Sequence, residues 1–151
     1  MFVAHMSMVM ASVRSMPQQD TAVIDGYITA QAKREQGEEY REARKVGDGD
    51  LNGDGVPDVA VLYTIEGQRG SNNYIQYLAV FVRANGKLVA ITHAKVGGRF
   101  YRSVESLQIK DKAILLETLD YTQKDAACCP SKKSSTEYSV VANKLRERKG
   151  R

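Results

Sequence analysis

The stretch YIQYLAVFVRANGKLVAITHAKV, residues 74–96, decides the fold. Two runs rich in β-branched and aromatic side chains, 74–83 and 88–96, flank a short segment that contains Asn85 and Gly86. Such runs favour strands, and an Asn-Gly pair suits the positive φ angles of a type I′ turn. The sequence therefore predicts an antiparallel hairpin near the middle of the chain.

Further strands are predicted on both sides of this hairpin. Residues 56–67, VPDVAVLYTIEG, indicate a buried strand that stops at a glycine. Residues 103–109 and 113–120 flank Lys110–Lys112 as a second hairpin, and 137–142 form a last strand after a loop of about fifteen residues. Because the links are too short for parallel crossovers, about six or seven strands should form an antiparallel meander.

One helix is predicted before the strands, over residues 20–35, with Asp20 as its N-cap. Its apolar side chains share one helical face. They are Val23, Ile24, Tyr27, Ile28 and Ala32. The predicted fold class is therefore α+β, with one N-terminal helix packed on a predominantly antiparallel sheet.

Length and charge bound the organisation of the chain. The 151 residues suit one domain, which we place at 20–143. Residues 144–151, KLRERKGR, carry five basic side chains and one acidic, which accounts for the whole net charge of +4. We therefore expect a basic disordered tail there, and no nucleic-acid partner, because the body of the domain carries balanced charge.

Residues 1–19 differ in composition from the rest. All five methionines lie within the first sixteen residues, where no acidic side chain occurs. This composition is typical of the apolar part of an export signal, so the segment is interpreted as a leader remnant or disordered N-terminus. A wrongly assigned start remains the alternative. The interpretation predicts a periplasmic or secreted protein, and no apolar run reaches the roughly 20 residues of a membrane span.

The acidic loop, residues 50–58, carries the main functional prediction. Its sequence DLNGDGVPD places side-chain oxygens at alternate positions, with a glycine that permits a sharp turn. Hard cations such as calcium take six to eight oxygen ligands from loops of this kind. The predicted side-chain ligands are Asp50, Asn52, Asp54 and Asp58. The backbone carbonyl of Val56 is the expected next ligand, and an Asn-Gly and Asp-Gly turn without any ion is the alternative.

The string D-x-N-x-D-G-x-x-D, followed by an apolar strand, resembles the calcium loops of FG-GAP repeats in integrin-α-type propellers. The resemblance implies that the loop joins two strands, that calcium is a structural cofactor, and that Asp50, Asn52, Asp54, Val56 and Asp58 are its ligands. Asp48 lies outside the motif and is assigned a supporting contact. The chain holds one copy only, so the resemblance does not imply a propeller.

The two cysteines, Cys128 and Cys129, are neighbours in the tract ACCPSKK. They can form a vicinal disulfide, remain as two free thiols, or bond to a second chain. An oxidised pair would fit an extracytoplasmic location. A thiol-based redox or soft-metal-responsive role for this pair is the alternative function.

No catalytic arrangement is predicted. His93 has no second histidine beside it in the predicted domain, and Glu117 and Asp120 should face opposite sides of a strand. Arg99, Tyr101 and Arg102 form a small basic and aromatic cluster suited to an anion or a glycan. We therefore expect a non-catalytic exported calcium-binding domain. Its role would be binding or adhesion, with an unknown protein or glycan ligand and an oligomeric state that the sequence leaves open.

Overall fold

The computed structural model describes residues 15–149. Within this range the chain forms one α-helix and a nine-stranded antiparallel sheet, which confirms the predicted α+β class. The helix is α1 (Gln18–Arg34). The strands are β1 (Glu38–Glu39), β2 (Lys45–Gly49), β3 (Asp58–Glu66), β4 (Tyr74–Ala84), β5 (Lys87–Gly98), β6 (Arg102–Lys110), β7 (Ala113–Asp120), β8 (Lys132–Val141) and β9 (Lys144–Lys149). Two 3-10 turns, η1 (Arg41–Ala43) and η2 (Gln68–Gly70), complete the elements.

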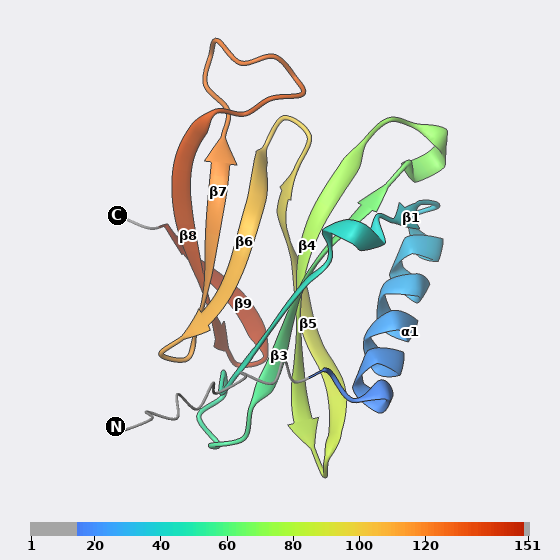
Figure 1. The fold of residues 1–151 in the computed structure, drawn as a ribbon, viewed down its shortest axis with the longest axis vertical. Helices are drawn as coiled ribbons and strands as arrows, with labels where there is room; N and C mark the ends of the chain where they lie inside the picture. Colours follow the sequence, from blue (N-terminus) through green and yellow to red (C-terminus); the bar gives the residue numbers. More distant parts are fainter. Residues whose placement is uncertain (1–14, 150–151) are drawn as a thin grey trace, which may run out of the picture.

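The strands follow one another across the sheet as a meander, in the order β1-β3-β4-β5-β6-β7-β8-β9. Strands β1 and β2 pair with successive parts of the same edge of β3. Strands β5 and β6 share a single register pair, Gly98 with Arg102, whereas the other neighbours pair along most of their lengths. The sheet therefore bends sharply at this point and divides into two halves, β1–β5 and β6–β9 (Figure 1).

Two cores fill the space on either side of the first half-sheet. Helix α1 covers one face, where Ile24 and Ile28 pack against Val61, Phe81 and their neighbours. The second half-sheet lies against the other face in a separate core. This second core contains Leu62, Leu78, Val80, Val96, Val104, Ile114, Leu116 and Tyr138. Strand β3 is buried on both faces, which explains why residues 59–63, VAVLY, are continuously apolar and do not alternate with polar residues.

The predicted apolar face of the helix is confirmed. Ile24, Ile28 and Ala32 are buried in the first core, and Val23 and Tyr27 pack against it. The predicted N-cap is wrong, because the helix begins after Pro17 and Asp20 lies in its first turn. Asp20 is buried and pairs with a side chain distant in sequence, accepting bonds of 2.7 and 3.2 Å from Arg83.

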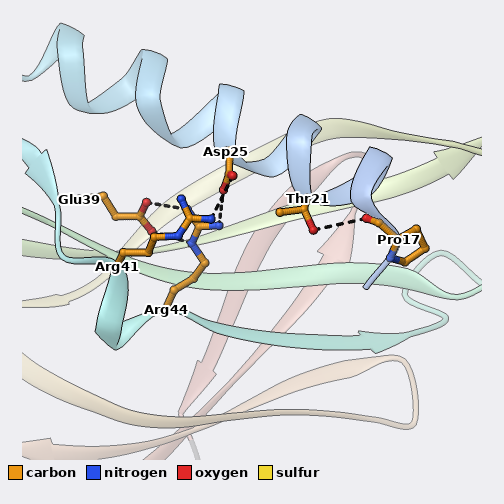
Figure 2. A network of polar contacts seen from close by, with 6 residues as sticks. All are labelled: Pro17, Thr21, Asp25, Glu39, Arg41 and Arg44. Carbon is orange, nitrogen blue, oxygen red and sulfur yellow. Dashed lines mark hydrogen bonds and ion pairs between the residues drawn. The ribbon is translucent and has the colours of Figure 1, made fainter. Parts of the chain in front are cut away.

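An ionic network holds the exposed side of α1 to the segment that leads into β2 (Figure 2). Arg44 donates to both carboxylate oxygens of Glu39, at 2.7 and 2.6 Å, and to Asp25 at 2.6 Å. Arg41 adds a second bond to Asp25, at 3.0 Å. The guanidinium of Arg44 is mostly buried, so its pairing with two carboxylates fixes where this segment crosses the helix.

The links between strands gather at two opposite ends of the molecule (Figure 1). The turn end, at the bottom of the view, holds the acidic loop and three two-residue hairpin turns. These turns are Asn85–Gly86, Asp111–Lys112 and Ala142–Asn143, and both residues of each have positive φ. The loop end, at the top, holds the longer links 67–73, 99–101 and 121–131. The hairpin predicted at Asn85–Gly86 is confirmed with its type I′ signs of φ.

The expectation of a disordered tail is wrong for residues 144–149, which form β9 and pair with β8. The turn at Ala142–Asn143 returns the chain, Leu145 packs against the second core, and Glu147 bonds to Arg102 at 2.8 Å. The many charged residues of this segment led to the prediction of disorder, although its alternate residues face inward as in a strand. At the other terminus, the leader assigned to residues 1–19 lies outside the described residues up to Arg14, and Gln18 and Gln19 already belong to α1.

The helix of the described region is too short and too polar to cross a membrane.

Candidate metal site

The acidic loop joins β2 to β3, two antiparallel strands that pair from Lys45–Leu62 to Gly49–Asp58. Strand β6 crosses close to β2 at this point. A Cβ atom on Gly47 would lie 2.5 Å from Leu107, and one on Gly49 would lie 2.6 Å from Ile109. A larger residue at either position would force Leu107 or Ile109 to move, so the two glycines let β2 pass close against the second half-sheet as it enters the loop.

Asp58, the first residue of β3, holds the loop to the sheet. Its side chain is 0% exposed, and its Oδ2 accepts the backbone N–H groups of Leu51 at 2.9 Å and Asn52 at 3.3 Å. Its Oδ1 accepts the N–H of Arg83 on β4, at 3.4 Å. The buried carboxylate therefore joins both arms of the loop to the sheet, and the side chain of Leu51 is buried in the second core.

Asp50 organises the middle of the loop. Its two carboxylate oxygens accept the N–H groups of Gly53 at 2.7 Å and Gly55 at 2.9 Å. Both glycines have positive φ, near 80°, a conformation that costs glycine little and other residues more. The N–H of Gly55, followed by that of Gly53, holds the pKa of the Asp50 carboxyl below its usual value, so Asp50 is charged at neutral pH.

The exposed tip repeats this arrangement between residues two positions apart. The amide oxygen of Asn52 accepts the N–H of Asp54 at 3.2 Å, and Oδ1 of Asp54 accepts the N–H of Val56 at 2.8 Å. Both contacts are Asx turns, in which a side chain imitates a backbone turn. The Val56 side chain is exposed at the end of the loop.

The fold brings three of the predicted ligands together. One carboxylate oxygen each from Asp50, Asp54 and Asp58 lies within 4.8 Å of the others. Because calcium–oxygen bonds are about 2.4 Å long, two ligands of one ion are at most about 4.8 Å apart, so these oxygens fit a single centre. Asn52 lies in the same loop. Asp48 does not join the cluster. It lies in β2, where its backbone is the register partner of Val59 in β3, and it lines a groove beside α1.

Lys112 is a neighbour that the sequence did not indicate. It belongs to the two-residue turn between β6 and β7, and its ammonium group lies beside Gly53 of the acidic loop. Its positive charge also contributes to the low pKa of Asp50. The ammonium group of Lys112 therefore lies at the edge of the loop, although Lys112 is 59 positions from Gly53 in the sequence.

The cysteine tract lies at the loop end, far from the acidic loop in the fold (Figure 1). Cys128 and Cys129 form a vicinal disulfide, and both residues are exposed. Asp125 organises this loop by accepting the N–H groups of Thr122 at 2.8 Å and Ser131 at 3.0 Å. These bonds, led by that from Thr122, lower the pKa of Asp125. The sequence did not indicate this role of Asp125, because no pattern in the tract shows that Thr122 and Ser131 are its hydrogen-bond partners.

A polar cluster between the end of α1 and the sheet was also missed. Tyr77 donates to the carboxylate of Glu35 at 2.8 Å, and Gln31 donates to the same oxygen at 2.9 Å. Nearby, the hydroxyl of Tyr27 bonds to Nδ1 of His93. Burial lowers the pKa of His93, which favours the neutral ring. The cluster ties the helix to β4 and β5.

No protein-family model, curated protein or solved structure matches this chain. The proposals below therefore depend on the geometry of the chain itself.

Proposed function

We propose that the chain is a non-catalytic, exported binding module in which one calcium ion stabilises the link between β2 and β3. The observation that carries the proposal is the convergence of three carboxylate oxygens, from Asp50, Asp54 and Asp58, within 4.8 Å. Close carboxylates repel one another, and a divalent cation removes that repulsion. An all-oxygen donor set favours calcium over zinc.

The proposed role of the ion is structural. Two of its ligands already bond to the backbone, Asp50 to the tip of the loop and Asp58 to the sheet, so an ion between them would join the tip to the sheet. Asn52 and the carbonyl of Val56 are the further proposed ligands, as the spacing of the loop predicts. Bound ions that are surrounded by protein ligands stabilise a turn without activating a water molecule for chemistry.

Calcium should raise the melting temperature of the protein by roughly 5 °C or more over the value in chelator. A ligand at 100 times its dissociation constant stabilises the native state by about 2.7 kcal/mol, and 1 kcal/mol shifts the midpoint of a domain of this size by about 2 to 4 °C. Differential scanning calorimetry in calcium, in magnesium and in chelator measures the shift.

Asp54→Asn is the informative variant, because Asn can still accept the N–H of Val56 but brings no charge to the ion. It should lose most of the calcium shift and keep its melting temperature in chelator. The matched control is Asp111→Asn, at an exposed aspartate in the neighbouring two-residue turn. Equal melting in calcium and chelator for the unmodified protein would disprove the metal site.

The exposed Cys128–Cys129 pair supports the exported location, because disulfides persist in oxidising compartments. The same pair supports a second candidate function, thiol–disulfide exchange. Its exposure gives an attacking thiolate access to either sulfur. This role requires that the reduced protein stay folded, which a stability measurement tests.

A further inference from the structure

The loop end presents aromatic side chains to solvent. Phe100 is 68% exposed and Tyr101 is 41% exposed, both in the link between β5 and β6. The ring of Phe100 lies 6.4 Å from the ring of Tyr121, which begins the link between β7 and β8. Two links that are distant in sequence therefore build one aromatic surface, and exposed aromatic patches of this kind mark binding surfaces.

Phe100 is held outward in an unfavourable backbone conformation. Its φ is +62°, in the left-handed region that bulky residues avoid. The N–H of Tyr101 bonds to the carbonyl of Gly98 at 3.1 Å, which closes the link into a tight turn around Phe100. An exposed ring gains little from burial to offset this strain. Residues in strained backbone conformations are enriched at functional sites, ligand-binding sites included.

Three cations border the aromatic surface, and one of them, Arg102, lies 4.7 Å from the centre of the Tyr101 ring and already pairs with Glu147; the other two have no such partner among the described residues. The guanidinium of Arg99 lies 5.0 Å from the centre of the Phe100 ring, and the ammonium of Lys95 lies 5.9 Å from that of Tyr101. Neither pairs with a carboxylate within the described part of the chain. Both can therefore donate hydrogen bonds to a ligand that lies over the rings.

A polar cavity of about 700 Å³ adjoins this surface. Its walls carry amide, hydroxyl and carboxylate groups: Glu38, Glu66, Ser71, Asn72, Asn73 and Tyr74. Arg99 connects the cavity to the aromatic patch, because its guanidinium donates to Asn72 and its N–H donates to the carbonyl of Tyr74 at 3.3 Å. Arg99 therefore lies between the rings, which a ligand could stack on, and the donors and acceptors of the cavity wall.

We propose that this surface binds a neutral oligosaccharide. A pyranose ring offers an apolar C–H face that can stack on Phe100 and Tyr121, and hydroxyl groups that can bond to the amides and carboxylates of the cavity. The carboxylates of Glu38 and Glu66 balance the positive charges of Arg99 and Lys95, so the surface has no excess of positive charge to favour a nucleic acid or an acidic peptide over a neutral ligand. The inference rests on the proposed binding role and names its ligand class; it is independent of the calcium loop, which lies at the opposite end (Figure 1).

Isothermal titration calorimetry with cellohexaose, chitohexaose, maltohexaose and laminarihexaose, each up to millimolar concentration, tests the proposal. At least one should bind, in calcium and in chelator alike. Phe100→Gly should weaken that binding tenfold or more, and its melting temperature should be unchanged or higher, because glycine relieves the strained φ. Asn72→Ala, on the cavity side, should weaken it about fivefold.

Val89→Ala is the matched control, since Val89 is 46% exposed and lies on β5 near the turn end. It should leave the affinity unchanged. The proposal fails if no hexasaccharide binds, if Phe100→Gly binds as tightly as the unmodified chain, or if a thymidine decamer or hexaglutamate binds more tightly than every sugar. Because these titrations are repeated in chelator, failure here leaves the calcium shift unaffected, and loss of the calcium shift leaves the sugar titrations interpretable.

Discussion

The turn end and the loop end of the molecule differ in how their links join the strands. At the turn end, three links are two-residue hairpin turns, and in the fourth, the acidic loop, the side chains of Asp50 and Asp58 bond inward to the backbone. At the loop end the links are longer, and Phe100 and Tyr101 point outward. Both ends contain non-glycine residues with positive φ, such as Ala142 at the turn end and Phe100 at the loop end, but at the loop end the positive φ belongs to an exposed aromatic residue.

The stability of the fold and the affinity for a ligand should therefore depend on opposite ends of the molecule. Changes at the turn end should alter the free energy of unfolding, because side chains there satisfy buried backbone groups. Changes at the loop end should alter ligand affinity and leave the fold intact, because few buried contacts depend on them. Three substitutions or treatments test this division.

The largest effect is expected from Asp58→Ala. The substitution leaves the N–H groups of Leu51, Asn52 and Arg83 without their carboxylate partner in a buried site. We expect a loss of about 3 kcal/mol in the free energy of unfolding, measured by urea denaturation in chelator.

The control for this measurement is Asp54→Ala, in the same loop. Asp54 is exposed and accepts one N–H, that of Val56, so its loss should be about 0.5 kcal/mol or less without metal. If the two variants lose the same free energy, Asp58 is not the anchor that its buried contacts indicate.

A smaller, opposite effect is expected at the β8–β9 turn. Ala142 has φ of +51°, and alanine gains nothing from its side chain in that conformation. Replacing the pair by Ala142→Asn with Asn143→Gly copies the turn at Asn85–Gly86 and should stabilise the protein by about 1 kcal/mol. Thermal denaturation checks the sign. Ala142→Val, which puts a β-branched residue at the same angle, should destabilise the protein instead.

The smallest effect is expected when the Cys128–Cys129 disulfide is reduced. The two residues are adjacent, so the bond closes almost no loop in the unfolded chain, and its loss should change the free energy of unfolding by less than about 0.5 kcal/mol. Denaturation with and without a thiol reductant measures this. The bonds from Thr122 and Ser131 to Asp125 should hold the loop in both states.

Asp125→Ala separates the two contributions. It should increase amide hydrogen exchange at Ser131 in the oxidised protein, whereas reduction alone should not. A loss of several kcal/mol on reduction would contradict the assignment of the loop to Asp125, and would also remove the support for reversible thiol exchange.

Local patterns predicted much of this molecule. The Asn-Gly pair favours its own turn, and the helical spacing of Ile24 and Ile28 predicts the buried face of α1. Three of the predicted ligand residues of the acidic loop, Asp50, Asp54 and Asp58, bring their carboxylates together because the loop turns tightly. Each of these features depends on residues within a few positions of one another, so the sequence is sufficient to specify them.

The features that were missed are those decided by topology. Asp20 pairs with Arg83, and Glu147 with Arg102, across separations of 63 and 45 residues. Lys112 reaches the acidic loop only because β6 crosses β2. The charges of β9 appeared to belong to a solvated tail, because the strand that pairs with it lies on the far side of a turn without glycine or proline. No pattern within one segment carries this information.

The place of β9 at the border of the sheet has a consequence for how copies of the protein meet. A terminal strand leaves a row of backbone groups open to another chain, which is the usual starting point of aggregation. In β9, the alternate residues Lys144, Arg146 and Arg148 are exposed basic residues beside these backbone groups. Two such borders brought together would set positive charges against one another, and this repulsion disfavours edge-to-edge pairing of two copies through β9.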